Sequence, residues 1–167
     1  MPIKSKNPSA QCQNKWEEAR PPLHRDIDYL KACGIGPGLA FANSILKKNL
    51  SIGEIGLVPC AIGGTQISEW RRGGPLYEQL LSRAHAALQG GGIIRAILWY
   101  QVQVALASAE GPYIDDIRKA QLGIDLPNVK CVDAKGMKIG YDGLHLSTEG
   151  EVHVGQMMAD AFAQFIA

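Results

Sequence analysis

The sequence has no excess of charge of either sign and no long uninterrupted apolar run. Its 17 Lys and Arg residues face 16 Asp and Glu residues, for a net charge of +1, so no basic surface indicates nucleic-acid binding. The longest apolar stretch, residues 93–108, is broken by Arg95, Gln101 and Gln103, which excludes a membrane span. We therefore expect neither a nucleic-acid partner nor a membrane partner.

Targeting and metal signals are also absent. The polar, proline-containing residues 1–22 lack the apolar stretch of a secretory signal, which favours a cytoplasmic location. No C-x-x-C spacing suggests a zinc or redox site, so reduced and mostly packed thiols are expected rather than disulfides. The four cysteines are Cys12, Cys33, Cys60 and Cys131. With 46% hydrophobic residues and no internal repeat or linker, the chain is predicted to be a single domain over residues 1–167.

Predicted strands and helices alternate along the chain. Apolar residues at helical spacing predict helices over 39–50, from Pro75 to the glycines at 90–92, over 112–123, and over 148–165 with a Thr148–Glu151 capping box. Short apolar runs predict buried strands over 53–60, 93–100 and 128–134, whereas residues 1–28 show no clear period and are predicted to be irregular. The alternation predicts an α/β fold with a parallel sheet covered on both faces.

One stretch breaks this alternation. Residues 93–108 contain two strand cores, "IIRAILWY" and "QVALAS", with nothing between them. A single strand of that length would extend ~50 Å, far beyond the usual strand. Two parallel strands need a crossover of about a dozen residues, and a hairpin needs turn residues that Tyr100, Gln101 and Val102 do not supply. One long bent strand is the alternative, but the physics favours a segment that is absent between Gln101 and Val102.

Asp142 and His145 are the first candidates for chemistry. A histidine that accepts a nucleophile's proton needs a carboxylate to orient its ring and stabilise the imidazolium, and a three-residue spacing in a loop permits that hydrogen bond. The alternative is a surface Asp and His in a loop before a helix, since a two-residue motif is weak. His153 lies inside the last predicted helix and adds no third ligand at a familiar spacing, so we expect no metal site.

Glycines supply the second candidate. Gly63 and Gly64 follow a predicted strand, where a backbone N–H can stabilise an oxyanion, although a tight turn would use the same residues. The "GIGPG" at 34–38 lacks the G-x-G-x-x-G spacing and is interpreted as the entrance to a helix. No serine stands in a G-x-S-x-G or a Gly-x-Ser turn after a strand, so the partner of a catalytic histidine is not found among the chain's serines.

Several segments in order, from about Trp16 to the end, resemble one family. They are "WEEARPPLH", "GIGPGLAFAN", "GLVPCAIGGTQISEW", "ILWYQ", "YIDDIRKAQ", "VKCVDAKG" and "DGLHLSTEG". The chain resembles the carbohydrate esterases of the sialate O-acetylesterase-like group of the SGNH hydrolase superfamily, especially the plant members. This resemblance implies a flavodoxin-like three-layer α/β/α sandwich, no cofactor, and hydrolysis of acetyl or other acyl groups on a sugar or another small ester.

The resemblance also implies roles for individual residues. Asp142 and His145 match the acid and base of a Ser-His-Asp triad, Gly63 and Gly64 match the oxyanion block, and Gln101 matches a block that continues "GES" in the family. The family opens with a strand and a "GQSN" turn that carries the serine, so the resemblance implies an incomplete fold. It lacks that first strand and a crossover segment after Gln101.

Three interpretations follow from these expectations, and one of them is a plain structural fragment with no stable function. The first is an esterase-family hydrolase whose present chain keeps Asp142 and His145 but is inactive without the serine. The alternative is a non-catalytic carbohydrate-binding or regulatory remnant, in which Trp70 stacks on a sugar and Arg71 or Arg72 pairs with anions.

Overall fold

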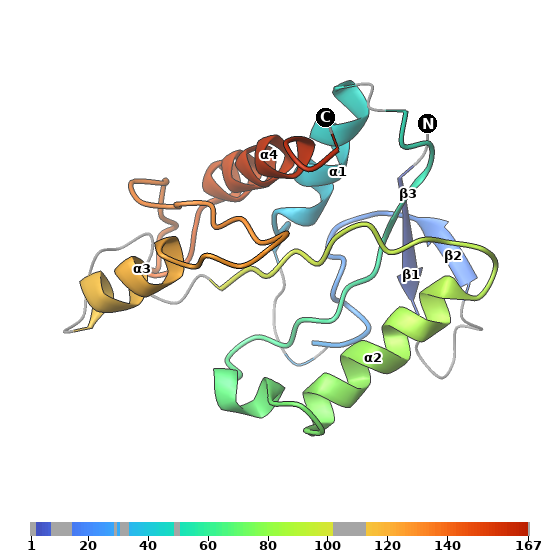
Figure 1. Ribbon diagram of the computed structural model, residues 1–167, viewed down its shortest axis with the longest axis horizontal. Helices are drawn as coiled ribbons and strands as arrows, with labels where there is room; N and C mark the ends of the chain where they lie inside the picture. Colours follow the sequence, from blue (N-terminus) through green and yellow to red (C-terminus); the bar gives the residue numbers. More distant parts are fainter. Residues whose placement is uncertain are drawn as a thin grey trace. The chain divides into compact units, whose positions relative to one another are not determined.

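A computed structural model describes residues 3–7, 15–28, 30, 34–48, 51–101 and 113–166 of the chain. The chain divides into two units, Met1–Ile35 with Gly53–Ile97, and Gly36–Ile52 with Leu98–Ala167. Within the described residues, the first unit carries a small sheet and one long helix, and the second carries three helices (Figure 1). The single domain over residues 1–167 stays a prediction.

The sheet in the first unit is mixed. Its strands are β1 (Ile3–Asn7), β2 (Lys15–Glu18) and β3 (Ile55–Leu57), in the order β2-β1-β3. β1 runs antiparallel to β2 and parallel to β3. The predicted parallel sheet is therefore confirmed for β1 and β3 and wrong for β2. The irregular prediction for residues 1–28 is wrong for 3–7 and 15–18 and confirmed for 19–28, while residues 1–2 and 8–14 lie outside the described residues. Backbone pairing makes a strand of "IKSKN" although its side chains show little apolar alternation.

Two predicted strands do not form in the described part of the chain. The structure describes both segments, residues 93–100 and 128–134, and neither forms a strand or pairs with one. Ile93 and Ile97 are each 72% exposed. An apolar run becomes a strand only when a neighbouring backbone completes its hydrogen bonds, so the pattern alone was insufficient. The second strand core of 93–108 and the residue after Gln101 lie outside the described residues.

The helices agree with their predictions. They are α1 (Gly38–Lys47), α2 (Pro75–Leu88), α3 (Ile114–Leu122) and α4 (Thr148–Ala163), and a short 3-10 helix, η1, spans Ile67–Trp70. Pro75 occupies the first turn of α2, where its missing N–H costs no hydrogen bond. The predicted cap of α4 is wrong: Ser147, not Thr148, is the N-cap, and its Oγ accepts a hydrogen bond from the Gly150 N–H at 3.2 Å.

α1 and α4 lie side by side in the second unit, and their apolar side chains pack against each other (Figure 1). Phe41 and Ile45 of α1 are buried, and the Phe41 ring meets Phe162 of α4 edge-on with centroids 5.7 Å apart. Burial of each such side chain contributes about 1.5–3 kcal/mol. The helices approach closely because Gly155 has no side chain; a Cβ there would lie 2.4 Å from the Pro37 carbonyl oxygen.

A second apolar cluster supports the loop that carries Asp142 and His145. Leu146, directly after His145, is buried with Ala134 and with Val154 of α4. Four partly buried side chains pack against this group: Tyr100, Met137, Ile139 and Met158. The residue beside the candidate histidine is thus anchored in the core, which limits the freedom of the loop.

Candidate active site

The loop from Lys138 to Ser147 is a short antiparallel turn that leads into α4. Ile139 and Leu146 form a β-bridge, and the Gly140 N–H donates to the His145 carbonyl oxygen at 2.7 Å. Gly143 adopts a φ of +69°, a left-handed conformation that side chains disfavour. The hydrogen bond to its carbonyl oxygen and the β-bridge of the next residue therefore hold the His145 backbone in place.

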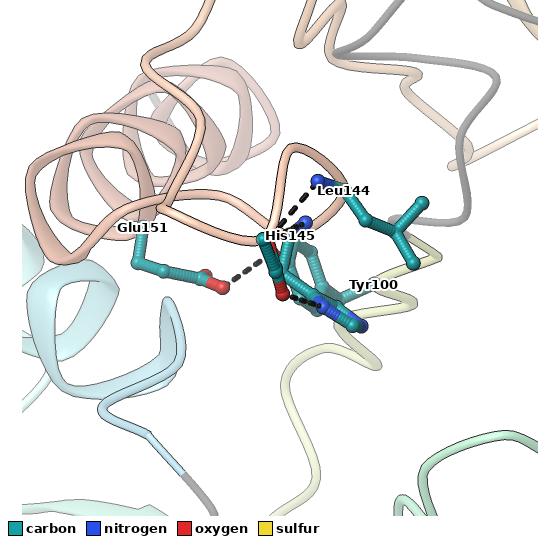
Figure 2. A network of polar contacts seen from close by, with 5 residues as sticks. Tyr100, Leu144, His145 and Glu151 are labelled. Carbon is teal, nitrogen blue, oxygen red and sulfur yellow. Dashed lines mark hydrogen bonds and ion pairs between the residues drawn. The ribbon is translucent and has the colours of Figure 1, made fainter.

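Asp142 is held in this turn by three hydrogen bonds (Figure 2). Its Oδ1 accepts from the backbone N–H groups of Leu144 and His145, both at 3.0 Å, while its Oδ2 lies 2.6 Å from His145 Nδ1. The hydrogen bond to the His145 ring is the main cause, and the two backbone N–H groups the next, that lower the pKa of Asp142 to about 2. Asp142 is thus a carboxylate at neutral pH and carries a charge beside the imidazole.

The contact with Asp142 selects one form of the His145 ring. A carboxylate accepts a proton from Nδ1–H, so the neutral tautomer leaves Nε2 as the ring nitrogen with a lone pair. The side chains are 67% exposed for His145 and 52% exposed for Asp142. The expected Asp142–His145 hydrogen bond is therefore present, and the His145 side chain is exposed to solvent.

Gly63 and Gly64 lie in the other unit, on the loop after β3. The Gly63 N–H already donates to Asp28 Oδ2 at 2.8 Å, whereas Gly64 has a left-handed φ of +76°. The loop is braced further on, where the Trp70 indole N–H donates to Thr65 Oγ1 at 3.0 Å. Asp28 was missed by the sequence reasoning, since 35 residues separate it from Gly63 and no local pattern signals the contact.

Gln101 is exposed and belongs to the same unit as Asp142 and His145. Its Oε1 accepts a hydrogen bond from the Trp99 indole N–H at 3.3 Å, which leaves the amide NH₂ to donate elsewhere. An amide donor of this kind can stabilise negative charge on a substrate oxygen. The oxyanion role of Gln101, Gly63 and Gly64 stays a prediction.

A second polar pair lies close to the histidine and was also missed. The Tyr100 hydroxyl donates to Glu151 Oε1 at 2.6 Å, across 51 residues of sequence. Figure 2 shows this pair in one network with His145 and Leu144. Burial, then the hydrogen bond to Glu151, raises the pKa of Tyr100 well above its usual range. Burial also raises the pKa of Glu151, against the opposing effects of Tyr100 and His145.

Other kinds of site find little support in the described part of the chain. No group of three or more His, Cys, Asp and Glu residues there is arranged to hold a metal ion. Of the two described cysteines, Cys60 is half-buried, with its thiol 3.4 Å from the Val58 carbonyl oxygen, and Cys131 is exposed, so the expected packing is confirmed for Cys60 and wrong for Cys131. Cys12 and Cys33 lie outside the described residues. None of the described helices combines the length and the apolar character that a membrane crossing requires.

An α/β chain with an aspartate-braced histidine at the start of its last helix is what a serine esterase of the α/β class would contain. The family model described as "carbohydrate esterase, sialic acid-specific acetylesterase" matches residues 5–101 and 102–164, which is most of the chain. The chain therefore belongs to this carbohydrate esterase family.

A plant protein resembles this chain in both sequence and structure. The chain is 43% identical to the probable carbohydrate esterase At4g34215 of Arabidopsis thaliana over 185 residues, which cover 89% of this chain and 71% of that protein. The crystal structure of the Arabidopsis protein AT4G34215 matches with a TM-score of 0.87 and 40% identity, over 99% of this chain and 82% of that one. The structural match supports the SGNH-type α/β fold expected from the resemblance, although the sheet in the described residues is small and mixed.

The same comparisons contain a discontinuity. The family match comes as two consecutive segments that meet between Gln101 and Val102. The region shared with the Arabidopsis protein is 185 residues long, more than the 167 residues of this chain. The relative thus has residues within the matched region that have no counterpart here.

Proposed function

We propose that the chain is a carbohydrate esterase-family hydrolase in which Asp142 and His145 are the acid–base half of a Ser-His-Asp mechanism. The hydrogen bond of 2.6 Å between Asp142 Oδ2 and His145 Nδ1 is the observation that carries this proposal. The substrate is an acetylated carbohydrate or a similar small ester, a class indicated by the family and by the name of the Arabidopsis relative.

In this mechanism each group has one task. His145 Nε2 takes the proton of the attacking hydroxyl and later returns one to the departing sugar oxygen, while Asp142 orients the ring and stabilises the imidazolium. The amide of Gln101, which lies in the same unit as His145, stabilises the tetrahedral oxyanion. The oxyanion role of Gly63 and Gly64 remains what the family resemblance implies, and the Gly63 N–H donates to Asp28.

We infer that the nucleophile is the part of the mechanism that is missing from this chain. The described serines lie in β1 (Ser5, buried), α1 (Ser44), the segment before β3 (Ser51), η1 (Ser68) and α2 (Ser82), and Ser147 is the N-cap of α4. Ser9 and Ser108 lie outside the described residues. The discontinuity after Gln101 supports the same proposal, since the "GES" block and the crossover segment would follow there. We infer that the chain by itself is inactive.

The test is covalent labelling together with hydrolysis of an acetyl ester. The purified chain should show no burst of product and no serine-directed labelling by a fluorophosphonate probe. A variant that gains a "GQSN" strand before residue 1 and a "GES" segment with its helix after Gln101 should hydrolyse the ester. Turnover should then fall by about three orders of magnitude or more on His145→Ala. Hydrolysis by the unmodified chain that is lost on Ser68→Ala would overturn the proposal.

A sugar-binding role without catalysis is the second candidate. Arg71 and Arg72, directly after η1, are both exposed, so they can reach an anionic sugar. The Trp70 indole N–H is engaged by Thr65, which fixes the ring in one orientation. Titration with acetylated and free sugars separates the two functions: binding that Arg71→Ala and Arg72→Ala abolish but His145→Ala leaves intact favours this second role.

A further inference from the structure

Tyr100 directly precedes Gln101, to which the proposed function assigns the oxyanion, and the proposed mechanism gives Tyr100 no task. Its hydroxyl donates to Glu151 Oε1 at 2.6 Å, and Glu151 lies in the first turn of α4. The same side chain packs against the buried cluster that contains Leu146, the residue directly after His145. Tyr100 is therefore held both by a hydrogen bond and by apolar packing.

Both contacts reach the segment that carries the candidate histidine. The Glu151 N–H donates to the Ser147 carbonyl oxygen at 2.9 Å, so the carboxyl group that accepts from Tyr100 belongs to the turn that begins two residues after His145. All of these residues lie in the second unit, and Figure 2 shows Tyr100 and Glu151 together with His145. Tyr100 therefore links the residues before Gln101 to the backbone that carries the histidine.

The Glu151 carboxyl group depends on this hydroxyl. Within the described residues, its Oε2 is buried and has no hydrogen-bond partner, while its Oε1 accepts from Tyr100. A buried carboxyl oxygen without a partner costs free energy, and a hydrogen bond to a carboxylate is stronger than one between neutral groups. Loss of the hydroxyl would therefore leave both oxygens without a partner in the described part of the chain, which favours the bonded arrangement.

Gln101 needs such a link, because its own contact is local. Its Oε1 accepts from Trp99 Nε1 at 3.3 Å, and both side chains are exposed. That contact joins residues two apart and does not connect Gln101 with the histidine loop. The described residues 93–100 form no strand, so sheet hydrogen bonds do not hold this segment either. The side chain of Tyr100 is the connection that the structure shows between this segment and α4.

We propose that Tyr100 is a positioning residue, which ties Gln101 to the start of α4 through the hydrogen bond to Glu151. The tether keeps the Gln101 amide at a constant position with respect to the Asp142–His145 pair. Its value for catalysis rests on the proposed function, because an oxyanion donor is effective when its position is set before the reaction. The tether itself does not depend on that function and can be measured in the chain as it exists.

The experiment is NMR of the full chain, which follows the Trp99 indole N–H and the Gln101 amide, assigned with Trp99→Phe and Gln101→Met. Tyr100→Phe keeps the ring and removes the hydroxyl. Both signals should move toward their positions in the unfolded chain, and their protons should exchange with water about fivefold faster or more. Glu151→Ala should have the same effect, whereas Glu151→Gln keeps an acceptor oxygen and should preserve both signals. Tyr113→Phe is the matched control, because that ring is 69% exposed.

A second measurement tests the catalytic consequence. It uses the variant that gains the "GQSN" strand and the "GES" segment. In that variant, Tyr100→Phe should lower kcat by about tenfold or more and leave KM nearly unchanged, because the oxyanion forms only in the transition state. Tyr113→Phe should leave both constants unchanged. A rise in KM with an unchanged kcat would contradict a positioning role for Tyr100.

The two proposals can fail separately. Unchanged Trp99 and Gln101 signals in folded Tyr100→Phe overturn the tether, and so do equal losses in Glu151→Ala and Glu151→Gln, since the second variant retains the acceptor. If Tyr100→Phe does not fold, the comparison of the two Glu151 variants decides. If the extended variant does not hydrolyse the ester, the esterase proposal fails, while the NMR comparison still decides the role of the hydroxyl.

Discussion

Two aspartate pairs, one from each unit of the molecule, differ in burial. In the first unit, Asp26 Oδ2 lies 2.9 Å from Arg83 Nη1, with side chains 5% and 8% exposed. In the second, Asp142 Oδ2 lies 2.6 Å from His145 Nδ1, with side chains 52% and 67% exposed. The buried pair joins residues 57 apart in sequence, and the exposed pair joins residues three apart.

The difference shows what each pair can do. Arg83 connects α2 to the turn at residues 23–27, and its Nε and Nη2 are buried without a hydrogen-bond partner in the described residues. Removing one member would leave an uncompensated buried charge. The exposed pair contributes little to stability, because water screens its charges, and the His145 side chain is open to solvent. The buried pair therefore bears on stability, and the exposed pair is the one to which the proposed function assigns chemistry.

The largest effect on stability should come from breaking the buried pair. Asp26→Ala leaves the Arg83 guanidinium buried without its carboxylate, so the free energy of unfolding should fall by about 3–5 kcal/mol. Urea denaturation followed by circular dichroism measures this loss. Asp26→Leu combined with Arg83→Met removes both charges and should recover most of it. A double variant as unstable as Asp26→Ala would show that the apolar packing, not the lost charge, is at fault.

A smaller effect should follow when the support of the exposed pair is changed. Ser147→Ala removes the Oγ that accepts from the Gly150 N–H, and the loss of such an N-cap costs about 1 kcal/mol. The thermal midpoint should fall modestly, and the Asp142–His145 loop should exchange its amide protons faster. Thr148→Ala, at the first helical position, is the matched control and should change little. Equal losses in the two variants would mean that the cap is assigned to the wrong residue.

The smallest effect concerns the pH dependence of the exposed pair. The folded-state pKa of Asp142 is lowered from 3.8 to about 2, so its contribution to stability is present above about pH 4 and is lost as the pH falls through 2. The contribution should be small because the side chain is exposed. Carbon-detected NMR of the Asp142 carboxyl should give a midpoint near 2 that rises toward the ordinary value in His145→Ala. An unchanged midpoint would mean that the backbone N–H groups, not the ring, hold the carboxylate.

The sequence alone was sufficient to predict those features whose interacting residues are close together along the chain. The four helices were predicted from apolar periodicity, from Pro75 and from the glycines after α2, because helical hydrogen bonds join residues four apart. The Asp142–His145 hydrogen bond was predicted for the same reason, since three residues and a glycine turn determine its geometry.

The tertiary structure decided everything that depends on a distant partner. β1 and β2 became strands by pairing with each other, and residues 93–100 did not, because a strand exists only where another backbone completes it. The contacts Asp28–Gly63 and Tyr100–Glu151 span 35 and 51 residues and leave no periodic trace in the sequence. The sequence by itself determined the helices and the Asp142–His145 hydrogen bond. The sheet, the bracing of the glycine loop and the Tyr100–Glu151 contact depend on which distant segments meet in the folded chain.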